Sequence, residues 1–119
     1  MTTAEIAEAF AELIREGRDR EAGERFWSED VTSLEPVEGD MARLEGAEAI
    51  RRKLDWWEST FRVIEAETRG PYLHGDRFAL WFRVKAEGPE GVTEMEEIGL
   101  YTVRDGRVVE ERFFAGPDG

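Results

Sequence analysis

The chain has 119 residues, with 28 acidic and 16 basic side chains, a formal net charge of −12 and no cysteine. Its length predicts one domain, residues 1–119, with a single core. This charge argues against partners that are read through positive charge, nucleic acid and anionic membranes. The absence of cysteine excludes disulfides, thiolate nucleophiles and cysteine metal sites.

Two helices are expected at the start of the chain. Thr2 and Glu5 form a capping box that begins the first, and Gly17 stands where that helix should end. Its apolar residues follow helical spacing; they are Ile6, Phe10, Leu13 and Ile14. A second, short helix has Asp19 as its expected N-cap and carries Phe26 and Trp27 inward.

A short strand and a third helix are expected next. The strand covers residues 31–35 and stops at Pro36, and a polar loop covers residues 37–44. The helix runs from about residue 46 to residue 60, with Trp57 on its apolar face and Trp56 about 100° away from it.

The rest of the chain predicts an antiparallel meander. Its strands are expected at 61–68, 72–73, 78–86, 92–104 and 107–115. Turn residues separate them, and the Asp105-Gly106 pair is a strong hairpin signal.

The order of these elements, together with three motifs, resembles the SnoaL-like branch of the nuclear transport factor 2-like superfamily. The motifs are Leu44-Glu45-Gly46-Ala47-Glu48-Ala49-Ile50, Gly75-Asp76-Arg77-Phe78, and the segment from Tyr101 to Phe114. The resemblance implies an α+β fold: a cone-shaped barrel of N-terminal helices packed on a strongly curved antiparallel sheet. It also implies a pocket between the helices and the concave face, and a homodimer formed through the outer face. Such a family contains isomerases, cyclases, dehydratases and epoxide hydrolases, beside members without known activity.

The last hairpin suggests two alternative sites. With a two-residue turn, Glu111 shares the more apolar face with Leu100, Ile98 and Phe113, and this face is expected to turn toward the helices. Burial there would raise the pKa of Glu111 and suit it to general acid–base catalysis.

A one-residue bulge would reverse the faces. It would move Glu97, Tyr101 and Arg112 into the pocket instead. These three also combine a carboxylate, a phenol and a cation, and on the outer face they would form a cross-strand ion pair at the dimer contact.

The remaining candidates are ligand-binding residues. Trp56, Tyr72 and Phe113 are expected to line the pocket, and His74 lies in a turn beside Asp76. One histidine without cysteine, and acids that alternate along a strand, predict no metal site.

The expected function is that of a small-molecule pocket protein. The first hypothesis is a cofactor-free isomerase, cyclase or hydrolase that acts on a small hydrophobic substrate by general acid–base catalysis. The alternative is a non-catalytic, dimeric module that binds a ligand or a partner. A cytoplasmic location is expected, since no signal peptide or membrane-spanning stretch is visible. The homodimer is what the resemblance implies.

Overall fold

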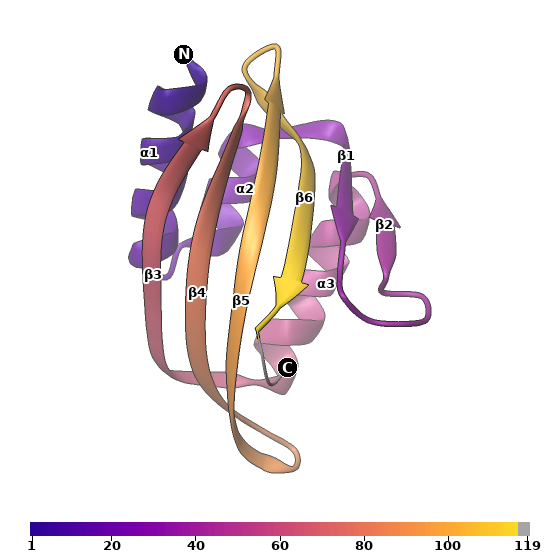
Figure 1. Ribbon diagram of the computed structural model, residues 1–119. Coiled ribbons are helices and arrows are strands. Elements are labelled where there is room, and N and C mark those ends of the chain that lie inside the picture. The colour runs from indigo at the N-terminus through magenta and orange to yellow at the C-terminus, as the bar shows by residue number, and fades with distance from the viewer. Residues whose placement is uncertain (117–119) are drawn as a thin grey trace.

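A computed structural model describes residues 1–116; residues 117–119 of the predicted domain lie outside the described part. The elements in chain order are α1 (Thr3–Arg15), α2 (Asp19–Phe26), β1 (Trp27–Leu34), β2 (Arg43–Glu45), α3 (Ala47–Thr60), β3 (Arg62–His74), β4 (Arg77–Gly88), β5 (Gly91–Arg104) and β6 (Arg107–Ala115) (Figure 1). None of the helices in this part of the chain has the length and apolar character needed to cross a bilayer.

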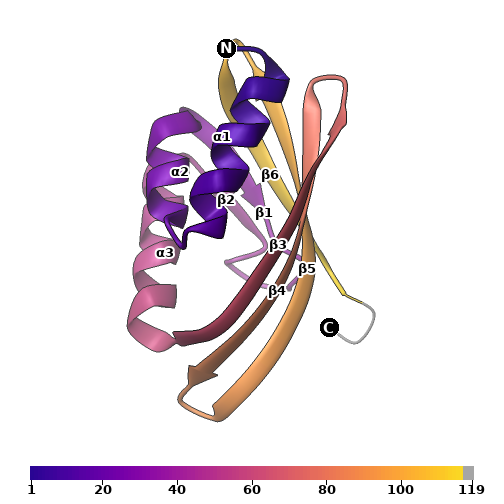
Figure 2. The ribbon, with the colours of Figure 1, turned by 90° about the vertical axis from the view of Figure 1, so that its left-hand side faces the viewer.

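The strands form one sheet in the order β2-β1-β6-β5-β4-β3. Only β1 and β6 run parallel to each other; the other neighbours are antiparallel. The sheet is strongly curved, and all three helices lie on its concave side (Figure 2). This is the α+β cone that the sequence predicts.

Helix α1 begins and ends as its sequence predicts. The Thr2 hydroxyl accepts a hydrogen bond from the Glu5 amide at 3.1 Å, and the Glu5 carboxylate accepts one from the Thr2 amide at 2.8 Å. Gly17 follows the helix with φ at +74°, a conformation that glycine adopts at low cost. The reciprocal pair satisfies two amides that the first helical turn leaves free.

Replacing Thr2 by alanine should therefore lower the free energy of unfolding by about 1 kcal/mol, the usual cost of losing an N-cap. Urea denaturation followed by circular dichroism would measure it. Thr3→Ala is the matched control: Thr3 is the first helical residue rather than the cap, and its replacement should change stability much less. Equal losses in the two variants would contradict a capping role for Thr2.

The core lies between α1, α2 and the concave face. Phe78 of β4 stacks on Tyr101 of β5 at a centroid distance of 4.9 Å, and Phe10 of α1 contacts both rings. Phe26 of α2 adds a fourth buried ring. The sequence predicts the inward positions of Phe10 and Phe26 from their helical spacing.

Several boundaries differ from those expected. Trp27 does not extend α2 but begins β1, which is longer than the predicted strand 31–35. The last two residues of the predicted loop 37–44 belong to the short strand β2, which pairs with β1. The strands expected at 61–68 and 72–73 form one strand, β3. Its register with β4 shifts between Arg69 and Tyr72, but the pairing continues on both sides of the shift.

The register of the last hairpin is the most consequential difference. Arg104 pairs with Arg107 and Val103 with Val108, but Thr102 then pairs with Glu110, so Val109 is an extra residue in β6. The predicted pairing of Leu100 with Glu111 is wrong, because this bulge shifts β6 by one position. Tyr101 is instead the partner of Glu111.

Candidate functional site

The bulge at Val109 brings candidate residues from both alternatives to the concave face. Beyond it, Tyr101 pairs with Glu111, Gly99 with Phe113 and Glu97 with Ala115. Directly opposed residues in a sheet share a face. Glu111 and Phe113 of the first alternative and Glu97 and Tyr101 of the second thus lie on one surface.

The residues of β5 and β6 that alternate with these concave-face residues lie on the outer face of the sheet. Leu100 pairs with Arg112 and Ile98 with Phe114, and Arg112, Ile98 and Phe114 are exposed. The expectation that Leu100 and Ile98 turn toward the helices is therefore wrong. So is the expectation that Arg112 joins Glu97 and Tyr101.

Glu111 is a buried carboxyl group with one hydrogen-bond donor. It is 5% exposed, and the indole Nε1 of Trp27 donates to its Oε2 at 2.8 Å. Burial raises the pKa of Glu111, while the Trp27 hydrogen bond and the charge of Lys53 oppose the rise. Glu111 is thus held in place and biased toward its neutral form.

Gly23 gives the Trp27 ring its position. A Cβ atom at Gly23 would lie 2.1 Å from the ring, closer than any real contact. The indole ring therefore packs directly against the backbone of α2 at Gly23, and its N–H, next to the ring atoms that contact Gly23, donates to Glu111. The sequence offers a weak signal of this contact, a glycine four residues before a tryptophan.

Lys53 reaches the same surface from α3. Its ammonium donates to Ser33 Oγ at 3.0 Å and to Glu35 Oε1 at 2.8 Å, and it lies 5.1 Å from the centroid of the Phe113 ring. The Lys53 and Glu35 side chains are only 14% and 21% exposed. Lys53, Glu35 and Ser33 were not predicted as site residues. The available signal for Lys53 is its place three positions after the apolar Ile50, on the same helical face.

Glu97 is a half-buried carboxyl group of this surface. Burial, and after it the charge of Glu35, raise the pKa of Glu97 to about 7, while the charge of Lys53 opposes the rise. Its neighbour Met95, two residues earlier on β5 and hence on the same face, is 37% exposed. The concave face therefore opens to solvent beside Glu97.

Tyr101 lies deeper on the same strand. It is 2% exposed, and burial, followed by the charge of Glu111, raises its pKa well above the ordinary value. The room for its hydroxyl comes from Gly99, where a Cβ atom would meet Tyr101 Oη at 2.9 Å and the Phe113 ring at 3.1 Å. The phenol is neutral across the physiological range and able to donate a hydrogen bond.

We call the six side chains that share this surface the concave-face cluster. They are Glu35, Lys53, Glu97, Tyr101, Glu111 and Phe113. Two carboxyl groups with raised pKa values, a neutral phenol and one ammonium can together donate, accept and relay protons. This combination carries the chemistry of the site.

A model of the SnoaL-like domain matches residues 1–115, nearly the whole chain. The chain belongs to the SnoaL-like family. A crystal structure from Mesorhizobium loti, of a protein provisionally described as a SnoaL-like polyketide cyclase [carbohydrate phosphatase], is 41% identical. It covers 96% of this chain and 99% of the other, with a TM-score of 0.93.

More distant structures share the fold. A Bacillus subtilis protein provisionally described as an isomerase is 22% identical, with a TM-score of 0.77 over 98% of this chain and 91% of its own. A Xanthomonas campestris protein of unknown function with a cystatin-like fold is 21% identical, with a TM-score of 0.76 over 98% and 92%. No curated protein matches the chain at a significant level.

Three predicted ligand-binding residues of this SnoaL-like domain lie away from the cluster. Tyr72 and His74 pair with Ala79 and Arg77 on the outer face and are exposed. Trp56 is 53% exposed and packs edge-on against Phe61. Of the four predicted ligand-binding residues, the structure brings only Phe113 to the concave-face cluster.

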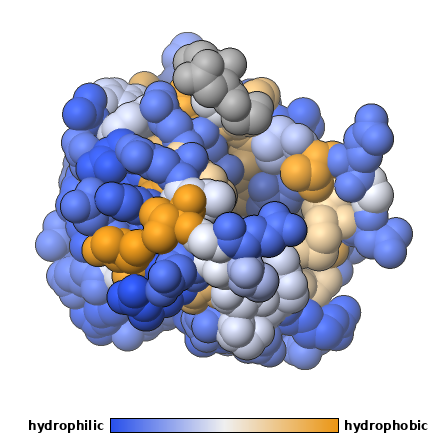
Figure 3. Space-filling model, turned by 90° about the horizontal axis from the view of Figure 1, so that it is seen from below, coloured by the Kyte–Doolittle hydropathy of each residue, from blue (hydrophilic) through white to orange (hydrophobic). Residues whose placement is uncertain are grey.

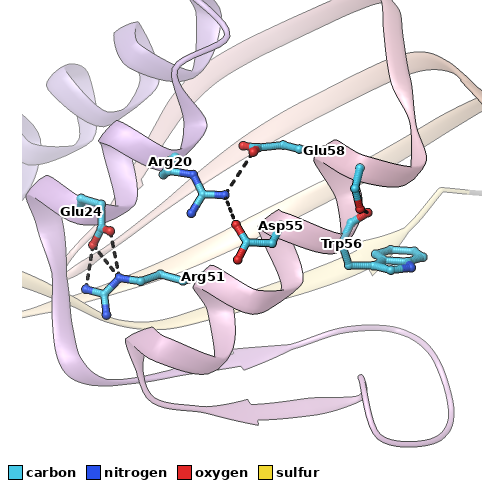
Figure 4. A network of polar contacts seen from close by, with 7 residues as sticks. Arg20, Glu24, Arg51, Asp55, Trp56 and Glu58 are labelled. Atoms are coloured by element: carbon cyan, nitrogen blue, oxygen red, sulfur yellow. Dashed lines mark hydrogen bonds and ion pairs between the residues drawn. The ribbon is translucent and has the colours of Figure 1, made fainter.

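Ion pairs hold α3 against α2 beside the cluster. Arg20 Nη2 forms ion pairs with Asp55 Oδ1 at 2.7 Å and Glu58 Oε2 at 3.1 Å. Arg51 donates to the Glu24 carboxylate from two nitrogens, Nε and Nη2. Figure 4 shows these pairs between the two helices and Trp56 projecting from α3 on the side away from α2. The pairs set the position of the helix that carries Lys53.

The surface hollows of the SnoaL-like domain touch the concave-face cluster only at Glu97. One is lined by Trp81, Glu96, Glu97, Ile98, Ala115 and Gly116, at the end of β6. Seen from the end of the molecule that carries the β4–β5 hairpin, apolar side chains interrupt a hydrophilic surface (Figure 3). Within residues 1–116, no three histidine, aspartate or glutamate side chains are grouped so that they could hold a metal ion.

Proposed function

We propose that the concave-face cluster binds a small hydrophobic molecule and catalyses a proton transfer on it without a cofactor. Glu97 is the proton-transfer residue. The observation that carries the proposal is the convergence of Glu97, Tyr101 and Glu111 on one partly open, apolar face. A general acid or base works best when its pKa lies near the working pH, and that of Glu97 is about 7.

The other residues of the cluster have supporting roles in this proposal. The neutral hydroxyl of Tyr101 donates a hydrogen bond to an oxygen on which negative charge develops. Trp27 holds Glu111 in place, and burial raises the pKa of this carboxyl group and so favours its neutral form. Isomerisation or ring closure of a carbonyl compound fits this set, in line with the descriptions of the Mesorhizobium loti and Bacillus subtilis proteins.

Proton exchange on a small apolar ketone would test the proposal. We expect the protein to accelerate deuterium incorporation at C1 of 2-tetralone in D2O, followed by NMR at pD 7. Glu97→Gln should lose ~100-fold or more of the acceleration, the usual contribution of a general base. Glu90→Gln, at the exposed β4–β5 hairpin, is the control and should exchange at the native rate.

A second outcome would favour a non-catalytic binding module. Trp27 donates to Glu111, and Lys53 donates to Ser33 and Glu35. Polar groups that are fixed by such bonds suit a site that holds a ligand without reacting with it. Saturable binding of 2-tetralone without any acceleration of exchange would support that alternative and exclude catalysis of this reaction by Glu97.

We also propose that the protein is a homodimer formed through the outer face, in the cytoplasm. Trp81, Ile98 and Phe114 are opposed across β4, β5 and β6 on that face, and Ile98 and Phe114 are each 45% exposed. Such an apolar strip favours contact with a second copy.

Ile98→Asp should therefore convert a dimer to a monomer, because a charge would be buried without a partner at the interface. Size-exclusion chromatography with light scattering would measure the mass. Val92→Asp is the control, since Val92 is exposed near the hairpin and outside the strip. A monomeric native protein, or a dimer that survives Ile98→Asp, would contradict the proposed interface.

A further inference from the structure

Two carboxyl groups of the concave-face cluster stand out because no cation pairs with them. Outside the cluster, arginines bridge the acids of the sheet; Arg83 alone lies within 4 Å of Glu65, Glu67 and Glu94. Within the described residues, neither Glu97 nor Glu111 forms an ion pair. The ammonium of Lys53 is engaged by Glu35 and Ser33 instead.

The cost of this arrangement is visible in both groups. Burial is the largest cause of the raised pKa of Glu97 and of Glu111, which means that desolvation outweighs the favourable charge of Lys53. A carboxylate that is desolvated and unpaired is stabilised strongly when a cation reaches it. The site is thus incomplete in positive charge.

Tyr101 provides a second, independent observation. Tyr101 is only 2% exposed, and no described residue forms a hydrogen bond with its hydroxyl. Every fully buried side-chain oxygen and nitrogen among the described residues has a partner, so the Tyr101 oxygen must border open space. The Tyr101 oxygen lies over Gly99, the residue between Tyr101 and Glu97 on this face of β5.

Aromatic rings complete the surroundings of Glu97. Phe82 is its direct partner across β4 and β5, and Phe113 lies next to Gly99 on β6. The Phe113 ring already holds the ammonium of Lys53 on its face at 5.1 Å. Ring faces of this kind attract organic cations as well as apolar groups.

We infer that the concave-face cluster takes a small organic cation, an ammonium group carried on an apolar body, with Glu97 as its counter-ion. This inference rests on the proposed function, since it assigns the substrate class of the same site. The apolar body packs on Phe82 and Phe113, and the Tyr101 hydroxyl meets a polar atom of the ligand. The net charge of −12 attracts cations to the protein from a distance.

A pair of probes that differ in charge and hardly in shape tests this. Phenyltrimethylammonium and tert-butylbenzene place the same three methyl groups on a nitrogen cation or on a neutral carbon. We expect the cation to bind the native protein at least tenfold more tightly at pH 8.5, measured by NMR titration. The cation does not titrate, so its affinity reports only on the protein.

The affinity for the cation should also rise with pH. The groups that face Glu97 are Glu35, which directly follows β1, Lys53 from α3, Glu111 from β6 and Tyr101 on its own strand. With a pKa of about 7, Glu97 passes from almost wholly protonated at pH 5.5 to almost wholly ionised at pH 8.5, an increase of ~30-fold in the ionised form. The affinity should follow that increase.

Glu97→Gln should remove both the preference for the cation and its pH dependence, and leave the affinity for tert-butylbenzene unchanged. Glu90→Gln should keep both. Equal or tighter binding of the neutral probe, binding of neither probe, or a preference that survives Glu97→Gln would overturn the inference. The comparison of the two probes on the native protein stands even if the variant fails to fold.

The two proposals fail separately. Proton exchange on 2-tetralone that depends on Glu97, without a preference for the cation, would overturn only the assigned substrate class. A preference for the cation that depends on Glu97, without proton exchange, would overturn the catalytic role and leave a cation-binding module.

Discussion

Replacing Glu97 by glutamine should stabilise the protein at pH 8.5 and leave its stability at pH 4 nearly unchanged. The pKa of Glu97 is raised from 4.5 to about 7 in the folded protein, so folding favours its protonated form. The stability that this preference contributes is complete below pH 4.5 and is lost as the pH rises through 7. The loss amounts to about 3.5 kcal/mol at most, from about 2.5 pH units at about 1.4 kcal/mol each, and to less where solvent reaches the carboxylate.

Glutamine has nearly the same shape and no titration, so the variant avoids this loss. Urea unfolding of both proteins at pH 4 and pH 8.5 would measure the difference. Glu90→Gln is the control, and its effect should be the same at both values because Glu90 is exposed on the hairpin. A variant no more stable than the native protein at pH 8.5 would mean that Glu97 is solvated, which would also remove the basis of its proposed role.

Replacing Gly23 by alanine should lower the free energy of unfolding by about 2 kcal/mol or more. Alanine ordinarily stabilises a helix relative to glycine by about 1 kcal/mol. Here its methyl group would lie 2.1 Å from the Trp27 ring, so the ring must move or α2 must shift. Overpacking of this kind costs about 1–3 kcal/mol, and displacement of Trp27 also removes the donor to Glu111.

Denaturation in urea gives the loss, and the indole N–H resonance of Trp27 reports on the bond to Glu111. Gly17→Ala is the matched control. It strains a residue with positive φ but has no atom within 4 Å of the added methyl group, so the Trp27 resonance should not move. A Gly23→Ala protein as stable as the native one would show that the Trp27 ring does not depend on Gly23 for its place.

Local signals determined most of the fold. Capping residues, glycines and apolar periods act over a few residues, so they are visible without the tertiary structure: Thr2 and Glu5 begin α1, and Asp105-Gly106 turns the last hairpin. The short strand β2 escaped prediction because its residues acquire their structure only by pairing with β1.

The candidate site was predicted only in part, for the same reason. Glu97, Tyr101, Glu111 and Phe113 were named from the pattern of two strands, and the structure places all four on the concave face. Trp56 and Tyr72 were named as residues of an expected pocket, and His74 as the one histidine, in a turn beside Asp76; all three lie away from the concave-face cluster.

The sequence by itself determined the family, the order of most elements and the pair of strands that carries the candidate carboxyl groups. The tertiary structure decided the face to which those groups turn, because one extra residue at Val109 reverses the alternation of a strand and no local pattern marks it. It also decided their partners. Trp27 lies 84 residues before Glu111 in the chain, and Lys53 lies on α3. Only the packing of α2, α3 and the sheet brings these two side chains to the cluster.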